Sequence, residues 1–183
     1  MIYENIEGFF NFDNIYQRMV NEAKDGAVFA EIGTFKGKSA VFMAEAIKRS
    51  GKDIKWYVID TFEGTEGEHD NDKDVISHSL YETYLNNIEP VKEFITETYV
   101  GDSKILHNRF PRESIDFLFI DGDHSYKGIK ADLDNWFHKV KRGGLIGGHD
   151  FTEPTCGVRI AVEQYFLFTG IVVDRTSWLY RKR

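Results

Sequence analysis

The chain has 183 residues, of which 42% are hydrophobic and 29% are charged, an ordinary composition for one globular domain with a sizeable core. Its formal net charge of −7 argues against a nucleic-acid partner, because duplex binding requires a positively charged surface. No apolar run approaches the roughly 20 residues that a membrane span needs, and the first residues lack the basic and apolar regions of a secretory signal.

Hydrophobic periodicity predicts an alternation of helices and strands along the chain. Residues 9–24 have apolar side chains at helical spacing and predict an amphipathic helix, which Asp25-Gly26 ends. The other predicted helices are 39–50, closed by Gly51, then 75–87, 103–108, 126–139 and 157–168. The predicted strands are 27–32, 55–60, 95–100, 115–121 and 145–149, the last entered by a turn at Gly143-Gly144, and a closing pair at 171–173 and 178–180.

This alternation predicts an α/β fold: a Rossmann-like, mainly parallel twisted sheet with helices on both faces and an antiparallel C-terminal edge. We expect a single domain over residues 1–183. It would consist of a helical lead-in at 1–26, a cofactor-binding core at 27–170 and closing strands at 171–183. The acidic segment 61–74 has no periodicity, which is typical of a mobile lid or a binding loop.

Five acidic residues each stand where a short apolar run ends. They are Glu31, Asp60, Asp102, Asp121 and Asp150. Because parallel strands present their carboxyl ends at one edge of the sheet, we expect these acids to line the crevice in which such sheets bind ligands. An acidic crevice with few fixed cations repels phosphate and suits a cationic or polyhydroxylated ligand, with a metal ion as a further candidate.

The loop after the first strand, Glu31-Ile32-Gly33-Thr34-Phe35-Lys36-Gly37-Lys38-Ser39, has three competing interpretations. A phosphate-binding P-loop requires one more residue between Gly33 and Gly37, and a dinucleotide fingerprint requires glycine at Phe35. Both would also place Glu31 beside a polyanion, at a cost on the order of several kcal/mol. The third ligand, S-adenosylmethionine, is cationic at its ammonium and sulfonium, so an acid at this position would favour it.

In this third interpretation Gly33 and Gly37 let the backbone approach the ligand, and Ser39 caps the following helix. Asp60 ends the second strand, where doubly wound folds place the acid that binds ribose hydroxyls. Asp102 and Ser103 end the third strand and are candidates for contacts with adenine. The alternatives are a tight strand-to-helix turn in which Glu31 is incidental, and a solvated turn at Asp102.

Two long motifs lie in the second half of the chain, S-I-D-F-L-F-I-D-G-D-H-S-Y at 114–126 and G-G-L-I-G-G-H-D-F at 143–151, with Asp132-Leu133 and Trp136 between them. They resemble the class I S-adenosylmethionine-dependent methyltransferases, and in particular the methyltransferase domain 24 family, which is related to metal-dependent sugar O-methyltransferases. The resemblance covers residues 27 to about 166. Asp60-Thr61-Phe62 with Gly64 is similar to the family's D-T-W-x-G segment, with Phe in place of Trp.

The resemblance implies that Glu31 and Gly33 line the methionyl and ribose region, that Asp60 binds the ribose and that Asp102 and Ser103 lie beside the adenine. The full set of predicted cofactor-binding residues is Glu31, Gly33, Thr34, Phe35, Gly37, Ser39, Asp60, Thr61, Asp102, Ser103 and Asp121. It also implies that Asp121 binds magnesium and that His124 is the general base. Catechol-type relatives have Asp-Asn as metal ligands after the fifth strand, where this chain has His149-Asp150.

The residue chemistry agrees with these catalytic roles. An unperturbed histidine side chain, the residue type at position 124, has a pKa suited to a base at neutral pH, and a divalent ion would activate an acceptor hydroxyl. We predict a metal site at Asp121, His149 and Asp150 for Mg²⁺ or Mn²⁺, with its occupancy left open. Alternatively, His124 caps the next helix or binds a strand-end carbonyl, and His149 has a structural role.

We therefore predict an S-adenosylmethionine-dependent O-methyltransferase that acts on a small hydroxylated acceptor such as a sugar. One alternative is a glycosyltransferase that uses Asp121-Gly-Asp123 as its D-x-D motif, and another is a cofactor-binding module without catalysis. The single cysteine, Cys156, excludes an internal disulfide and favours a cytoplasmic location, with a packed thiol favoured over a nucleophile. The expected partner is a small-molecule acceptor rather than a membrane or nucleic acid, and homo-oligomer formation is left open.

Overall fold

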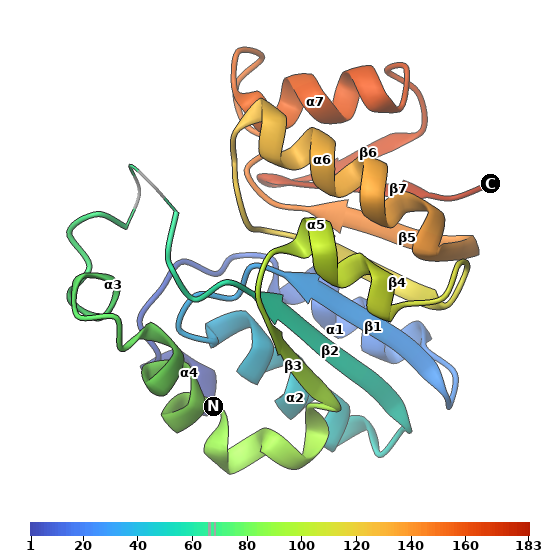
Figure 1. Ribbon diagram of the computed structural model, residues 1–183. Coiled ribbons are helices and arrows are strands. Elements are labelled where there is room, and N and C mark those ends of the chain that lie inside the picture. Colours follow the sequence, from blue (N-terminus) through green and yellow to red (C-terminus); the bar gives the residue numbers. More distant parts are fainter. Residues whose placement is uncertain (66, 68) are drawn as a thin grey trace.

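The computed structural model describes residues 1–65, 67 and 69–183; Glu66 and Glu68, which belong to the predicted loop 61–74, lie outside the described residues. Its strands form one sheet in the order β3-β2-β1-β4-β5-β7-β6 (Figure 1). Their bounds are β1 Ala27–Ile32, β2 Ile54–Asp60, β3 Glu97–Val100, β4 Ile115–Ile120, β5 Val140–Gly148, β6 Ile171–Asp174 and β7 Ser177–Arg181. Strands β1 to β5 are parallel, and β7 is antiparallel to both β5 and β6, which confirms the predicted fold class.

Helices cover both faces of this sheet (Figure 1). The α-helices are α1 Asp13–Glu22, α2 Lys38–Ser50, α3 Lys73–Ile76, α4 Leu80–Ile88, α5 Ser103–Leu106, α6 Tyr126–Trp136 and α7 Gly157–Tyr165, with 3-10 turns at Ile2–Asn5, Glu89–Phe94, His107–Arg109 and Phe137–Lys139. Side chains of β4 alternate between two cores, because successive residues of a strand point to opposite faces. Phe117 and Phe119 pack in the layer of α1, α2 and α4, whereas Leu118 and Ile120 pack in the layer of α6 and α7.

The first predicted helix, 9–24, is longer than the one that forms. Helix α1 begins at Asp13, whose negative charge suits a helix N-terminus, and it ends at Glu22 before an extended Ala23. Phe9 and Asn11 fit the helical spacing, but both belong to an irregular segment that precedes the helix. In this irregular segment the side-chain oxygen of Asn11 lies 2.9 Å from His149 Nε2 at the end of β5.

The predicted helix 75–87 is broken into α3 and α4. The break is at Ser77-His78-Ser79, where His78 has a φ of 57° and the backbone N–H of Ser79 donates to the carbonyl of Asp74. Serine side chains compete with helical hydrogen bonds, and Ser77 Oγ does so here by donating to the Lys73 carbonyl. Sequence periodicity alone does not show such a break.

Strand β5 begins five residues before the predicted start at 145, with Val140 paired to Ile115. Gly143-Gly144 is therefore an irregularity inside the strand rather than a turn before it, and Gly143 has a φ of 78°. The other predicted elements form with ends shifted by a few residues. The predicted helices 103–108 and 126–139 each end in a 3-10 turn, and the last α-helix ends at Tyr165. In the described part of the chain, no helix has the length and apolar character that crossing a membrane requires.

Candidate active site

A cavity of about 1080 Å³ lies along the carboxyl edge of the sheet. It extends from the end of β3, at Val100 to Lys104, to the end of β5, at His149 and Asp150. Eight carboxyl side chains and two lysines line it among the described residues, so its lining is strongly acidic. The predicted gathering of strand-end acids therefore occurs for Asp60, Asp102, Asp121 and Asp150.

The loop between β1 and α2 is anchored by Asp60 from the neighbouring strand. Asp60 Oδ2 accepts backbone hydrogen bonds from Thr34 at 2.6 Å and Phe35 at 3.0 Å, and Oδ1 accepts one from Phe62 at 2.7 Å. Burial raises the pKa of Asp60, and these three hydrogen bonds oppose the rise. Asp60 thus shapes the cavity wall while its remaining lone pairs can accept hydrogen bonds from a ligand.

Both glycines of this loop are required by packing, and of the two only Gly33 is among the described residues that line the cavity. Gly33 has a φ of 85°, and an added Cβ would lie 2.2 Å from the carbonyl oxygen of Asp121. Gly37 has a φ of 88°, an added Cβ would lie 2.8 Å from the Tyr84 ring, and it is not among the described residues that line the cavity. Gly37 is also the N-cap of α2, so the predicted cap at Ser39 is wrong; Ser39 lies inside the helix and lines the cavity.

Glu31 does not line the cavity either; it lies fully buried beneath the cavity floor. Its Oε1 accepts a hydrogen bond of 2.6 Å from the Tyr16 hydroxyl of α1. Burial raises the pKa of Glu31 to about 8, against the hydrogen bonds from Tyr16, Ser39 and Thr34, and the Asp121 charge adds to the rise. Glu31 is therefore largely protonated at neutral pH, and the acidic character of the cavity comes from other carboxylates.

This burial makes the stability of the fold depend on pH. From its ordinary pKa of 4.5 up to about 8, Glu31 is deprotonated in the unfolded chain but protonated in the folded one, so stability falls as pH rises. We expect wild type to lose up to about 4 kcal/mol more than Glu31→Gln between about pH 5 and pH 8. Urea unfolding at both pH values measures this difference, and equal losses in the two proteins would refute the assignment.

The end of the cavity at β3 has a second buried acid that the sequence did not single out as a site residue. Asp102 caps α5 by accepting from the Lys104 backbone at 2.8 Å, and Ser103 Oγ donates to Asp132 Oδ1 of α6 at 2.5 Å. Burial raises the pKa of Asp132 to about 6, although the Ser103 hydrogen bond opposes the rise. Asp102, Ser103 and Asp132 all line the cavity. The two predicted adenine contacts, Asp102 and Ser103, therefore lie where a ligand can reach them.

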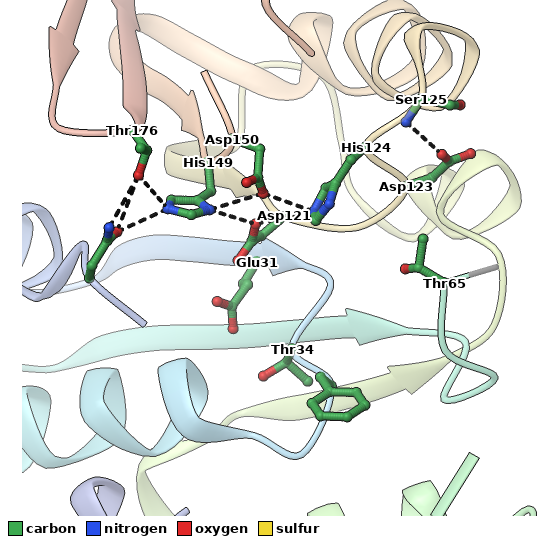
Figure 2. A network of polar contacts seen from close by, with 12 residues as sticks. Glu31, Thr34, Thr65, Asp121, Asp123, His124, Ser125, His149, Asp150 and Thr176 are labelled. Atoms are coloured by element: carbon green, nitrogen blue, oxygen red, sulfur yellow. Dashed lines mark hydrogen bonds and ion pairs between the residues drawn. The ribbon is translucent and has the colours of Figure 1, made fainter. Parts of the chain in front are cut away.

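At the end of the cavity near β5, side-chain atoms of Asp121, His124 and Asp150 that could bind a metal ion lie close together (Figure 2). His124 Nε2 lies 3.5 Å from Asp121 Oδ1 and 3.2 Å from Asp150 Oδ2, and the three atoms lie within 4.8 Å of one another. Neighbouring ligand atoms around a divalent cation with oxygen ligands are about 3 Å apart, so these residues fit such an ion. Burial raises the pKa of Asp150, but the hydrogen bond from His149 and the nearby histidine charges outweigh it and lower the pKa overall.

His149 approaches the same carboxylates from the buried side of the site (Figure 2). Its Nδ1 lies 3.0 Å from Asp150 Oδ2 and 3.7 Å from Asp121 Oδ1. Its Nε2 lies 2.9 Å from Asn11 Oδ1 and 2.8 Å from Thr176 Oγ1. Among the described residues, the potential ligand atoms that lie within 4.8 Å of one another belong to Asp121, His124 and Asp150, so the structure groups His124 rather than the predicted His149 with the two carboxylates.

Of the predicted cofactor-binding residues, nine line the cavity: Gly33, Thr34, Phe35, Ser39, Asp60, Thr61, Asp102, Ser103 and Asp121. The lining also includes Glu7, Gly8 and Phe9 from the segment before α1, and His69 from the loop after β2. Periodicity had assigned Phe9 to a helix, and no sequence signal linked Glu7 or Gly8 to the site. His69 belongs to segment 61–74, which was predicted to be a lid or a binding loop. The stacking of His69 on Phe35, with ring centroids 4.3 Å apart, is likewise a tertiary contact.

Several solved structures share this fold. The O-methyltransferase NovP has a TM-score of 0.69 and 22% identity, covering 93% of this chain and 79% of its own. CalS11, a TDP-rhamnose 3'-O-methyltransferase, has a TM-score of 0.61 and 15% identity over 92% of this chain and 76% of its own. An S-adenosylmethionine-dependent O-methyltransferase of Thermotoga maritima has a TM-score of 0.64 and 13% identity, covering 98% of this chain and 69% of its own. This chain therefore shares its fold with these three methyltransferases.

The family model Methyltransf_24, described as a methyltransferase domain, matches residues 30–151. The chain belongs to this family, which confirms the resemblance and favours a methyltransferase over the glycosyltransferase alternative. Among curated proteins it is similar to uncharacterized protein R132 of Acanthamoeba polyphaga mimivirus, with 28% identity over 131 residues, 71% of this chain and 54% of that protein. Uncharacterized protein y4gI of Sinorhizobium fredii is 24% identical over 127 residues, 66% of this chain and 12% of that protein. The chain thus spans about half of the first relative and a small part of the second.

Proposed function

We propose that the protein transfers a methyl group from S-adenosylmethionine to a hydroxyl of a small polyhydroxylated acceptor such as a sugar, assisted by a divalent cation at Asp121, His124 and Asp150. One observation carries the proposal: a single cavity joins a nucleoside-compatible end, at Asp60 and Ser103, to a cation-compatible end at the three converging groups. Its acidic lining suits a donor with a positively charged sulfonium and ammonium.

The chain's own residues would align the two reactants. Methyl transfer is an in-line displacement at carbon, and correct alignment alone can contribute roughly 7–11 kcal/mol. Asp60 and the loop that it anchors would position the nucleoside. Because β4 is adjacent to β1, Asp121 of the three-residue cluster lies beside that loop. A bound divalent cation would supply Lewis acidity that lowers the pKa of the acceptor hydroxyl and holds its oxygen.

His124 has two candidate functions, because an imidazole nitrogen that binds a cation cannot accept a proton at the same time. We favour the cation, since Nε2 of His124 faces the same point as two carboxylates. A metal-free site would instead leave His124 as the general base. The predicted cytoplasmic location and the absence of nucleic-acid partners remain part of the proposal and are supported by composition.

Chelation separates these possibilities. We expect treatment with EDTA followed by its removal to lower methyl transfer by about a hundredfold or more, and Mn²⁺ or Mg²⁺ to restore it. The measurement is S-adenosylhomocysteine release with a panel of sugar acceptors. Full activity after exhaustive chelation would assign His124 to proton transfer and exclude a required metal.

A further inference from the structure

The segment Glu7–Asn11, which we call the N-terminal strap, crosses one side of the cavity in an irregular conformation. At one end Glu7 pairs with Lys36 Nζ at 2.8 Å, and Lys38 Nζ donates to the carbonyl of Gly8 at 3.0 Å. At the other end Asn11 contacts His149 at 2.9 Å through its side chain. The strap is therefore held from both sides of the cavity, by the loop after β1 and by the end of β5.

This attachment places Phe9 in the cavity lining with 74% of its surface exposed. Gly8 makes the turn possible with a φ of 131°, a conformation that other residues rarely adopt. One side of the Phe9 ring packs against His149, with centroids 5.5 Å apart. Exposure of so much aromatic surface is unfavourable in water, so a ligand that covers the open side of the ring gains free energy.

Phe9 also lies beside the groups that would hold the reacting oxygen. His149, on which its ring packs, is 3.0 Å from Asp150, a member of the three-residue cluster (Figure 2). The other exposed apolar side chain in the lining, Val100, lies at the opposite end of the cavity, at the end of β3. Phe9 therefore belongs to the acceptor end and not to the nucleoside end.

The neighbours of Phe9 define the chemistry of the ring that would cover it. Glu7 lies two residues before it in the strap, Glu63 lines the same cavity, and Asp150 lies beyond His149. An exposed apolar ring in a cavity lined by carboxylates matches a saturated ring with an axial C–H face and equatorial hydroxyls.

We infer that the N-terminal strap is the acceptor-recognition element and that Phe9 is the platform on which the pyranose ring of the acceptor stacks. This inference rests on the proposed function and deepens it, since it names the substrate class and a residue that determines specificity. Loss of the platform removes an aromatic stacking contact, which corresponds to about three- to tenfold weaker binding of the ring.

Saturation-transfer difference NMR with methyl glycosides of glucose, mannose and rhamnose, in the presence of S-adenosylhomocysteine, tests this inference. We expect at least one glycoside to receive saturation at its ring C–H protons with wild type and with Phe9→Trp, and to lose affinity in Phe9→Ala by the stated factor. Phe168→Ala is the matched control, because Phe168 is 70% exposed and lies outside the described cavity lining. It should behave as wild type.

Two results overturn the inference: glycoside binding that is the same in Phe9→Ala and wild type, or binding of catechol but of no glycoside. Calorimetric titration with S-adenosylhomocysteine alone separates this failure from that of the proposed function. If S-adenosylhomocysteine binds wild type and Phe9→Ala but no glycoside shows dependence on Phe9, only the inference about the strap fails. If it does not bind wild type, the proposed function fails first.

Discussion

Replacement of Asp121 with asparagine is expected to reduce kcat for methyl transfer by about 10²- to 10³-fold, the range typical for loss of one group that stabilises charge at a reacting atom. The substitution preserves shape but removes the charge from the cluster that also contains His124 and Asp150. The fold should survive, because the backbone N–H of Asp121 donates to the Ile32 carbonyl at 2.7 Å and does not depend on the side chain.

The matched control for this experiment is Asp134→Asn. Asp134 lies on α6, where its side chain is 51% exposed and pairs with Lys130 at 2.7 Å. It is not among the described residues that line the cavity. Steady-state release of S-adenosylhomocysteine should therefore be unchanged in the control. Activity of Asp121→Asn within twofold of wild type would show that Asp121 neither binds a required cation nor contacts the reacting groups.

Replacement of Gly33 with alanine is expected to destabilise the fold by about 4 kcal/mol or more, which is the exceptional end of the range for single substitutions. The new Cβ would lie 2.2 Å from the Asp121 carbonyl oxygen and 2.7 Å from Gly122 Cα, both backbone atoms that cannot move aside easily. Gly33 also has a φ of 85°, so the substitution adds conformational strain to the collision.

Gly26→Ala separates these two contributions. Gly26 has a φ of 79°, close to that of Gly33, but an added Cβ would have no neighbour within 4 Å. It should lose only about 1–2 kcal/mol, the cost of a left-handed backbone for a residue with a Cβ. Urea unfolding of both variants measures the difference, and similar losses would show that the loops after β1 and β4 do not meet at Gly33 as described.

The sheet and its acidic edge could be predicted from sequence because both follow from local patterns. Short apolar runs give the strands, and the carboxyl ends of parallel strands lie at one edge of the sheet. The orientation of each acid cannot be obtained in this way. Glu31 follows the same pattern as Asp60, yet Glu31 points into the helix layer and meets Tyr16, whose position depends on the packing of α1.

The acceptor side could not be predicted for a related reason. Phe9 has the apolar spacing of a helix, yet it lies in an irregular segment in which Asn11 contacts His149, 138 residues later in the chain. The motif that contains His149 pointed correctly to the cluster at the end of β5. It could not show that His124 rather than His149 groups with the two carboxylates, because the position of the His149 ring depends on tertiary contacts with Asn11 and Thr176.

The central claim is that one acidic cavity holds a sulfonium donor beside a cation. A crystal structure with S-adenosylhomocysteine and Mn²⁺, with an anomalous difference map to locate manganese, tests it most directly. We expect the adenosyl group between Asp60 and Ser103, and a manganese peak among Asp121, His124 and Asp150. Nucleoside density outside this cavity, or manganese elsewhere while these three side chains stay unliganded, would contradict it.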